Sequence, residues 1–145
     1  MAINFHNPKT VSFSGKYSLA AEVPAGTRLL YVSGQVGTAP DGKLPVGFDA
    51  QCEQVWMNIG EVLRSAGMSY KDIVKVTVFL TDSRFVGPYR EVRDRFIKDA
   101  PYPASTLLIV AGLADPAMLV EVEVVVEPAI SARAKKAIDR MLAVV

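Results

Sequence analysis

The sequence is poor in the residues from which metal centres, disulfides and nucleophilic triads are built. Of its 145 residues, only Cys52 is a cysteine and only His6 is a histidine. A lone cysteine excludes an internal disulfide and a cysteine-based metal cluster. A lone histidine in a polar terminus argues against a zinc site and a Ser–His–Asp triad. We therefore expect neither a metal nor a cofactor.

Long apolar runs and strong net charge are also missing. Half of the residues are hydrophobic, yet no uninterrupted apolar stretch approaches the roughly 20 residues that span a bilayer. The polar start, residues 1–10, does not resemble a signal peptide. The formal net charge is +1, without an aromatic-rich basic stripe. We expect one domain over residues 1–145, in the cytoplasm, that binds neither membrane nor nucleic acid.

Hydrophobic periodicity predicts six strands and three helices. Strands are expected at residues 10–14, 17–23, 28–32, 73–81, 105–111 and 118–127, the first two joined as a tight hairpin at Ser14 and Gly15. Helices are expected at residues 48–66, 83–98 and 131–145, the last a C-terminal helical extension. The order of the elements indicates an α+β fold, one sheet with both long helices on one face.

The last strand carries the best candidates for catalysis. Glu121 and Glu123 share one face, and valines occupy the other. Alternation alone fits an edge strand with a solvated, charged face. The sheet face opposite the helices is nevertheless expected to need a cover, and self-association would supply it. Burial beside a like charge disfavours the ionised form of a carboxylate, which suits a general acid or base near neutral pH.

Several motifs together resemble the Rid (reactive intermediate deaminase, or YjgF) family. The matching residues are Gly15, Tyr17 and Ser18, Leu30 to Gln35 (LYVSGQ), Val74 to Asp82 (VKVTVFLTD), Pro103 to Thr106, and Leu119 to Glu123. Each motif alone is short, but the combination is specific. The resemblance covers about residues 12–127, nearly the whole chain.

The resemblance implies a chorismate-mutase-like, six-stranded mixed sheet with two helices on one face. It further implies a homotrimeric barrel with small-molecule clefts at the subunit interfaces. Active members hydrolyse enamines and imines to ketones and ammonia; an arginine binds the substrate carboxylate and a glutamate positions water. Glu121 is the counterpart of that glutamate. Ser105 stands at the place of the arginine, so we expect a non-standard substrate specificity.

The remaining pocket residues are implied by the same resemblance. They are Lys16, Tyr17, Ser33, Gly34, Tyr89, Ser105, Thr106 and Leu107. Tyr89 and Lys16 depart from the family pattern, and Lys16, or else Arg90, is a candidate substitute cation. The alternative is that Lys16 is simply exposed to solvent. A noncatalytic trimer that binds a small metabolite is the alternative function. Endoribonuclease activity is disfavoured by the near-neutral charge and the missing histidine pair.

Overall fold

The computed structural model describes residues 3–128 and 140–143. Four strands form a mixed sheet in the order β3-β6-β4-β5, and β1 and β2 form a separate two-stranded sheet. The strands are β1 (Asn4–His6), β2 (Ala20–Glu22), β3 (Leu30–Val36), β4 (Ile73–Leu80), β5 (Ala104–Ile109) and β6 (Val120–Val126). The helices are α1 (Phe48–Ser65) and α2 (Val86–Phe96), with short 3₁₀ turns at Tyr70–Asp72 and Ser83–Phe85.

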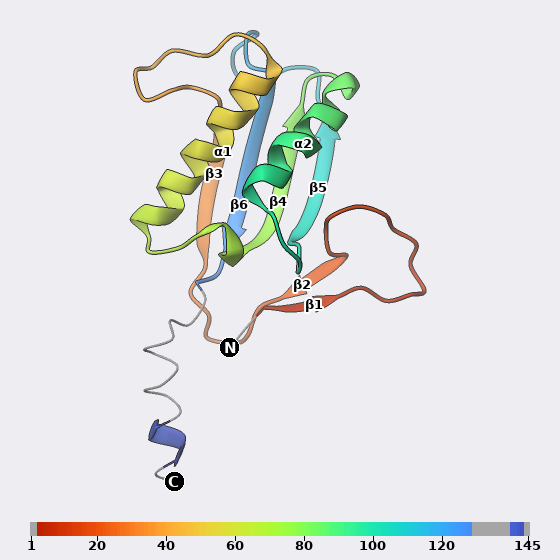
Figure 1. The fold of residues 1–145 in the computed structure, drawn as a ribbon, viewed down its shortest axis with the longest axis vertical. Coiled ribbons are helices and arrows are strands. Elements are labelled where there is room, and N and C mark those ends of the chain that lie inside the picture. The colour runs from red at the N-terminus through yellow and green to blue at the C-terminus, as the bar shows by residue number, and fades with distance from the viewer. Residues whose placement is uncertain (1–2, 129–139, 144–145) are drawn as a thin grey trace.

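Both long helices cover one face of the four-stranded sheet (Figure 1). The even-numbered residues of β6, from Val120 to Val126, are all buried on this helix side. Glu121, Glu123 and Val125 alternate with them on the other side, here called the open face. The predicted two faces of this strand are therefore confirmed. The edge-strand interpretation is wrong, because β6 lies between β3 and β4 and is hydrogen-bonded on both sides.

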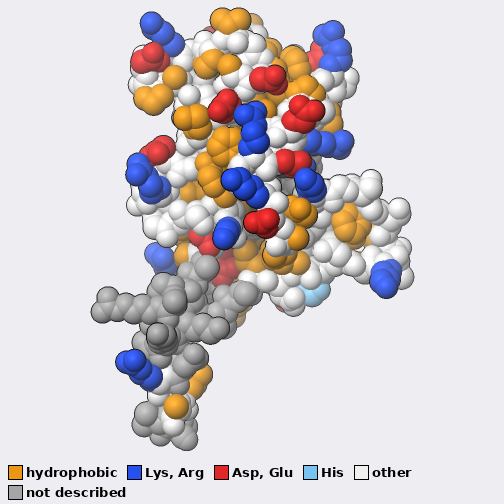
Figure 2. All heavy atoms as spheres, viewed as in Figure 1, with side chains coloured by type: hydrophobic (Ala, Val, Ile, Leu, Met, Phe, Trp, Pro, Cys, Tyr) orange, Lys and Arg blue, Asp and Glu red, His pale blue; other side chains and the backbone are white. Residues whose placement is uncertain are grey.

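The two helices pack through apolar residues at helical spacing. In α1 the buried positions include Cys52, Val55, Trp56, Ile59 and Leu63. Gly67 follows α1 with φ +72°, the left-handed conformation predicted for it. Pro88 lies in the first turn of α2, where its missing amide proton costs no helical hydrogen bond. The outward surfaces of the helices carry charged side chains of both signs (Figure 2).

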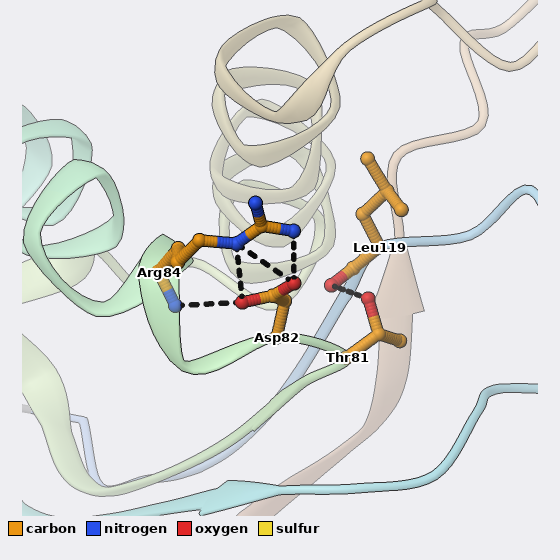
Figure 3. A network of polar contacts seen from close by, with 4 residues as sticks. All are labelled: Thr81, Asp82, Arg84 and Leu119. Atoms are coloured by element: carbon orange, nitrogen blue, oxygen red, sulfur yellow. Dashed lines mark hydrogen bonds and ion pairs between the residues drawn. The ribbon is translucent and has the colours of Figure 1, made fainter.

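Polar contacts fix the chain where β6 begins. The side chain of Gln51 accepts from Leu119 N at 2.9 Å and donates to Ala117 O at 3.0 Å. Thr81 N, at the end of β4, donates to Leu119 O at 3.2 Å. Next to it, Asp82 accepts bonds from the backbone and guanidinium of Arg84 (Figure 3). Those bonds lower the pKa of Asp82 to about 2. The start of β6 is thus held from two neighbouring elements.

The amino-terminal prediction named the wrong pair of strands. No strand forms at residues 10–14; β1 pairs with β2 instead, and residues 7–19 form the long connection between them. The β-rich character of Val11 and Phe13 misled the prediction. In the folded chain the ring of Phe13 packs edge-on against that of Tyr17, with centroids 5.3 Å apart. The six strands consequently divide between two sheets. The pairing of β1 with β2, across residues 7–19, thus replaces the predicted tight hairpin.

The predicted terminal helix, residues 131–145, lies mostly outside the described residues; residues 140–143 within it are helical. In the described part of the chain, no helix combines the length and apolarity needed to cross a membrane.

Candidate functional site

Glu121 projects from β6 toward an irregularity in β3. Val32 pairs with Val124, whereas Gln35 pairs with Val122, so Ser33 and Gly34 together oppose a single residue. This two-against-one arrangement is a β-bulge, which interrupts the ladder and redirects nearby side chains. The bulge falls within the sequence motif singled out in the third strand. The single opposing residue is Glu123, and one bulge residue, Gly34, lies against the side chain of the predicted catalytic Glu121.

The absence of a side chain at Gly34 leaves space for the carboxylate of Glu121. A Cβ atom added at Gly34 would lie 2.8 Å from the Glu121 carboxyl carbon and 2.9 Å from Oε1. Ordinary side chains avoid contacts this short, so only glycine lets the carboxylate lie against the β3 backbone. We call Ser33, Gly34 and Glu121 the carboxylate cradle. Glu121 is half-buried and takes no part in the ion pairs within residues 3–128.

A second group of predicted residues meets at the start of β5. Ser18 pairs with Ala104 and donates its N–H to Pro103 O at 3.0 Å, so the segment before β2 runs beside β5. Tyr17 is half-buried there. Ser105 pairs in parallel with Val76, which is buried under the helices, so the Ser105 side chain faces the helix side. We call Tyr17, Ser18 and Ser105, which lie at the start of β5, the β5 end of the site.

Lys16 is tied to α2 at the same place. Its Nζ lies 3.1 Å from Asp94 Oδ2, and Arg93 binds the other oxygen of that carboxylate at 2.9 Å. Burial raises the pKa of Asp94, but hydrogen bonds from Arg93 and Lys16 outweigh it and leave the pKa lowered. The carboxylate is therefore held in its charged form between two cations. We call Lys16, Arg93 and Asp94 the basic cluster.

Two other pocket candidates divide between the sheet faces. Thr106 pairs with Thr77 on the open face and accepts a hydrogen bond from Lys75 Nζ. Leu107 pairs with Val78 and packs against the hydrophobic core on the helix side. Thr106 is therefore available to a ligand on the open face, whereas Leu107 is a core contact.

Tyr89 was wrongly assigned to the pocket. Its side chain is 1% exposed, and it belongs to the core between the helices and the sheet. The helical spacing indicates this burial, because Tyr89 lies one turn from Phe85 and Val92 on the buried face of α2, and the resemblance led to the wrong assignment. Burial raises the pKa of the phenol, whose hydroxyl has no hydrogen-bond partner among the described residues. A small ligand cannot reach this side chain without opening the core.

Cys52 is a core residue, as predicted. It is fully buried in α1, and burial raises the pKa of its thiol to about 12. A thiol in this environment stays protonated and is not a nucleophile. Within the described residues, no group of three His, Cys, Asp or Glu side chains could hold a metal ion.

One chain does not bring the two halves of the predicted site together. Glu121 pairs with Phe79 and Ser105 pairs with Val76, on opposite sides of β4. Two strand spacings and three residues along the strand separate their backbones by about 14 Å. Their side chains also point to opposite faces of the sheet. A single small ligand therefore cannot contact both within one subunit.

The sequence interpretation missed Arg93 and Asp94. Both lie in the last turn of α2, on a surface that contains other charged residues, and nothing in the local pattern separates them from Arg90 or Arg95. Their closeness to Lys16 depends on a contact across 78 residues of sequence. Only the folded chain reveals it.

Comparisons with known proteins agree with this fold. Residues 9–128 match the model of the family described as Endoribonuclease L-PSP. A RutC family protein of Aquifex aeolicus is 33% identical over 81% of this chain and 90% of its own length. A mouse protein named 2-iminobutanoate/2-iminopropanoate deaminase is 37% identical over 68% of this chain and 72% of its own.

Solved structures lead to the same conclusion. A crystal structure of a Rid family protein of unknown function from Yersinia pestis superposes with a TM-score of 0.79 at 30% identity, covering 88% of this chain and 99% of that one. RidA from an Antarctic Psychrobacter has a TM-score of 0.66 at 38% identity, covering 80% and 91%. Sequence and fold agree over the strands that carry the carboxylate cradle and the β5 end, and the chain therefore belongs to the Rid (YjgF, endoribonuclease L-PSP) family.

Proposed function

We propose that this protein is a hydrolytic deaminase that converts a small reactive imine or enamine to the ketone and ammonia. The observation that carries the proposal is the carboxylate cradle, a half-buried glutamate placed over a glycine in a strand bulge. A carboxylate held against backbone with no competing cation is suited to move protons. The names of the mouse relative and its mammalian counterparts support this class of reaction.

The chemistry assigned to Glu121 is proton transfer. The carboxylate accepts a proton from water as the water oxygen bonds to the carbon of the protonated imine, which gives a neutral carbinolamine. The carbinolamine nitrogen takes up that proton from the carboxyl group, the C–N bond breaks, and ammonia leaves with the electron pair of that bond. The remaining protonated carbonyl loses its proton to solvent to give the ketone. Water is consumed and the glutamate is regenerated, so no cofactor enters the balance.

The proposed active unit is a homotrimer with its sites between subunits. Glu121 and Ser105 lie on opposite faces in one chain, so a neighbouring copy is needed to bring both to one ligand. The open face also carries exposed apolar surface, with Tyr31 at 74% and Leu108 at 41% exposure. Such surface favours association. Light scattering in solution is expected to give the mass of three chains; the mass of one chain would contradict the proposal.

The deaminase activity can be tested with 2-iminobutanoate formed in solution by an amino-acid oxidase. The protein is expected to accelerate ammonia release above the spontaneous rate. Glu121→Gln keeps the shape of the side chain but removes the base, so activity should fall by about 10²-fold or more. Glu123→Gln, on the same face of the strand but with an exposed side chain, is the matched control. Equal activity of wild type and Glu121→Gln would refute the assignment.

Ser105 favours a second function, a noncatalytic trimer that binds a small metabolite. A neutral hydroxyl at that position can donate and accept hydrogen bonds but cannot form an ion pair with a carboxylate. A ligand that raises the melting temperature without being turned over would favour this reading. RNA cleavage, suggested by the family description, is less well supported, because the only histidine pairs with Glu22 on β1 and β2.

A further inference from the structure

We propose that a groove on the exposed side of α1 is a docking site for the chain's own C-terminal segment, residues 131–145, which packs there as an amphipathic helix. The groove has a volume of about 490 Å³, and Pro40, Met57 and Tyr70 supply its apolar lining. Met57 is 48% exposed, although it lies in the middle of α1. This interaction surface is independent of the proposed deaminase function.

Hydrogen bonds to α1 fix both walls of the groove. On one side the hydroxyl of Tyr70 donates to a backbone carbonyl of α1 at 2.7 Å. A side chain at Gly60 would collide with that hydroxyl, so only glycine lets Tyr70 lie on the helix. On the other side Asn58 Nδ2 donates to Thr38 O at 2.9 Å and holds the loop between β3 and α1 against the helix. The groove is therefore formed before anything binds in it.

The chain leaves the sheet next to this groove. Glu127 follows β6, and its N–H donates to Asp72 O at 2.9 Å. Asp72 ends the short 3₁₀ turn that begins with Tyr70, so β6 ends beside one wall of the groove (Figure 1). A helix over residues 131–145 would be about 22 Å long, which exceeds the roughly two turns of α1 that line the groove. The segment is therefore long enough to cover the groove.

The sequence of the C-terminal segment supplies an apolar stripe of the kind that such a groove binds. Apolar residues recur there at helical spacing, namely Ala134, Ala137, Ile138, Met141, Leu142 and Val145. Residues 140–143 are helical in the structure, and Met141 and Leu142 are 71% and 69% exposed. This stripe and the groove thus both present apolar side chains to water, and burying one against the other is favourable.

The charges of the two surfaces are complementary. Helix α1 carries three acidic residues and one basic residue, and two of the acids, Glu53 and Glu61, lie one turn before and one turn after Met57. The C-terminal segment instead carries one acidic residue and four basic residues, Arg133, Lys135, Lys136 and Arg140. Opposite charges at the rim of an apolar contact favour one partner and one orientation over others.

Disulfide crosslinking of the full-length protein tests the contact. Met57→Cys is combined with Ala137→Cys or with Met141→Cys, two positions one helical turn apart. The native Cys52 does not interfere, because it is fully buried and the pKa of its thiol is about 12. At least one pair is expected to form a disulfide within the chain about tenfold faster than the same partner does with Val11→Cys, because docking raises the effective concentration of the thiols. Val11 is the matched control, since it is 50% exposed but distant in sequence from the groove.

Trypsin cleavage of the full-length protein reports on docking without new cysteines. Cleavage after Lys136 and Arg140 requires the segment to leave the groove. Met57→Gln replaces an apolar side chain with a polar one of similar length and should speed this cleavage about tenfold, because the apolar contact is weakened. Val11→Gln is the control and should be cleaved at the wild-type rate. Mass spectrometry of the intact chain identifies the cleaved bonds.

Three results would overturn the docking site. They are crosslinking by both cysteine pairs no faster than by the controls, a disulfide that joins two chains instead of one, and equal cleavage of wild type and Met57→Gln. The second result would assign the groove to the segment of a neighbouring copy. Melting curves show whether each variant folds. Met57 and Val11 are both about half exposed, so their substitutions should leave the core intact.

Discussion

The carboxylate cradle and the basic cluster are positioned by different kinds of interaction. Glu121 belongs to a strand with a hydrogen-bonded neighbour on each side, and the cradle is shaped by backbone pairing and one glycine. The basic cluster joins a loop residue to the end of a helix through side-chain ion pairs. Backbone ladders form cooperatively with the core, whereas partly exposed ion pairs contribute little to stability. The carboxylate cradle is thus fixed by the sheet itself, and the basic cluster is fixed by side-chain contacts alone.

The largest effect is expected from closing the cradle. Gly34→Ala introduces a methyl group at 2.8 Å from the Glu121 carboxyl carbon and must displace the carboxylate. A displacement of this order lowers activity about a hundredfold. Ammonia release from 2-iminobutanoate measures it. Gly112→Ala, where a Cβ would meet nothing within 4 Å, is the control and should be silent. Full activity of Gly34→Ala would remove Gly34 from the site.

The second comparison concerns stability. Val122 is fully buried beside Glu121, so Val122→Ala loses two methyl groups from the core and should lower the free energy of unfolding by about 2 kcal/mol. Val11, 50% exposed in the segment of residues 7–19, makes the matched control, and Val11→Ala should change it by less than about 0.5 kcal/mol. Urea unfolding at fixed protein concentration measures both. Equal losses would contradict the contrast between the two regions.

A smaller effect is expected at the basic cluster. Asp94→Ala removes both ion pairs of the basic cluster, yet partly exposed pairs of this kind stabilise a protein by less than about 1 kcal/mol. Because folding lowers the pKa of Asp94, its contribution is present above the pKa of the unfolded chain and is lost as pH falls through the lower, folded value. Urea unfolding of wild type and variant should therefore differ at neutral pH and converge in acid. A difference in unfolding free energy that grows as the pH falls would contradict a lowered pKa of Asp94 in the folded chain.

The smallest effect concerns the ion pair near the start of β6. Arg84 donates several hydrogen bonds to Asp82 and is largely responsible for the pKa of about 2 of that carboxyl group (Figure 3). In Arg84→Ala the pKa of Asp82 should rise toward its ordinary value of 3.8. Titration of the carboxyl carbon by NMR measures the change. Arg84 is exposed, Asp82 is partly exposed and neither belongs to the carboxylate cradle, so we expect no effect on deamination; a loss of activity would link this pair to the cradle.

Much of the fold was predictable because helices and interior strands carry their own period. The valines of β6 and the apolar stripe of α1 identified two elements and the faces that they bury. The separation of Glu121 from those valines followed from the same alternation. Residues 7–19 were not predictable in this way, since a β-rich composition there coexists with a long connection. Tyr89 was misplaced when the resemblance was preferred over its helical spacing.

The sequence alone determined the helices, the central strands, the face that carries Glu121 and the family, because each depends on residues close together in the chain or on short motifs. The tertiary structure decided what surrounds those residues. The bulge that places Gly34 beneath Glu121 is a matter of register between β3 and β6. The opposite facing of Ser105 depends on its pairing with β4, and the basic cluster on a contact between Lys16 and α2. Register and long-range contacts depend on the whole fold, and local periodicity does not encode them.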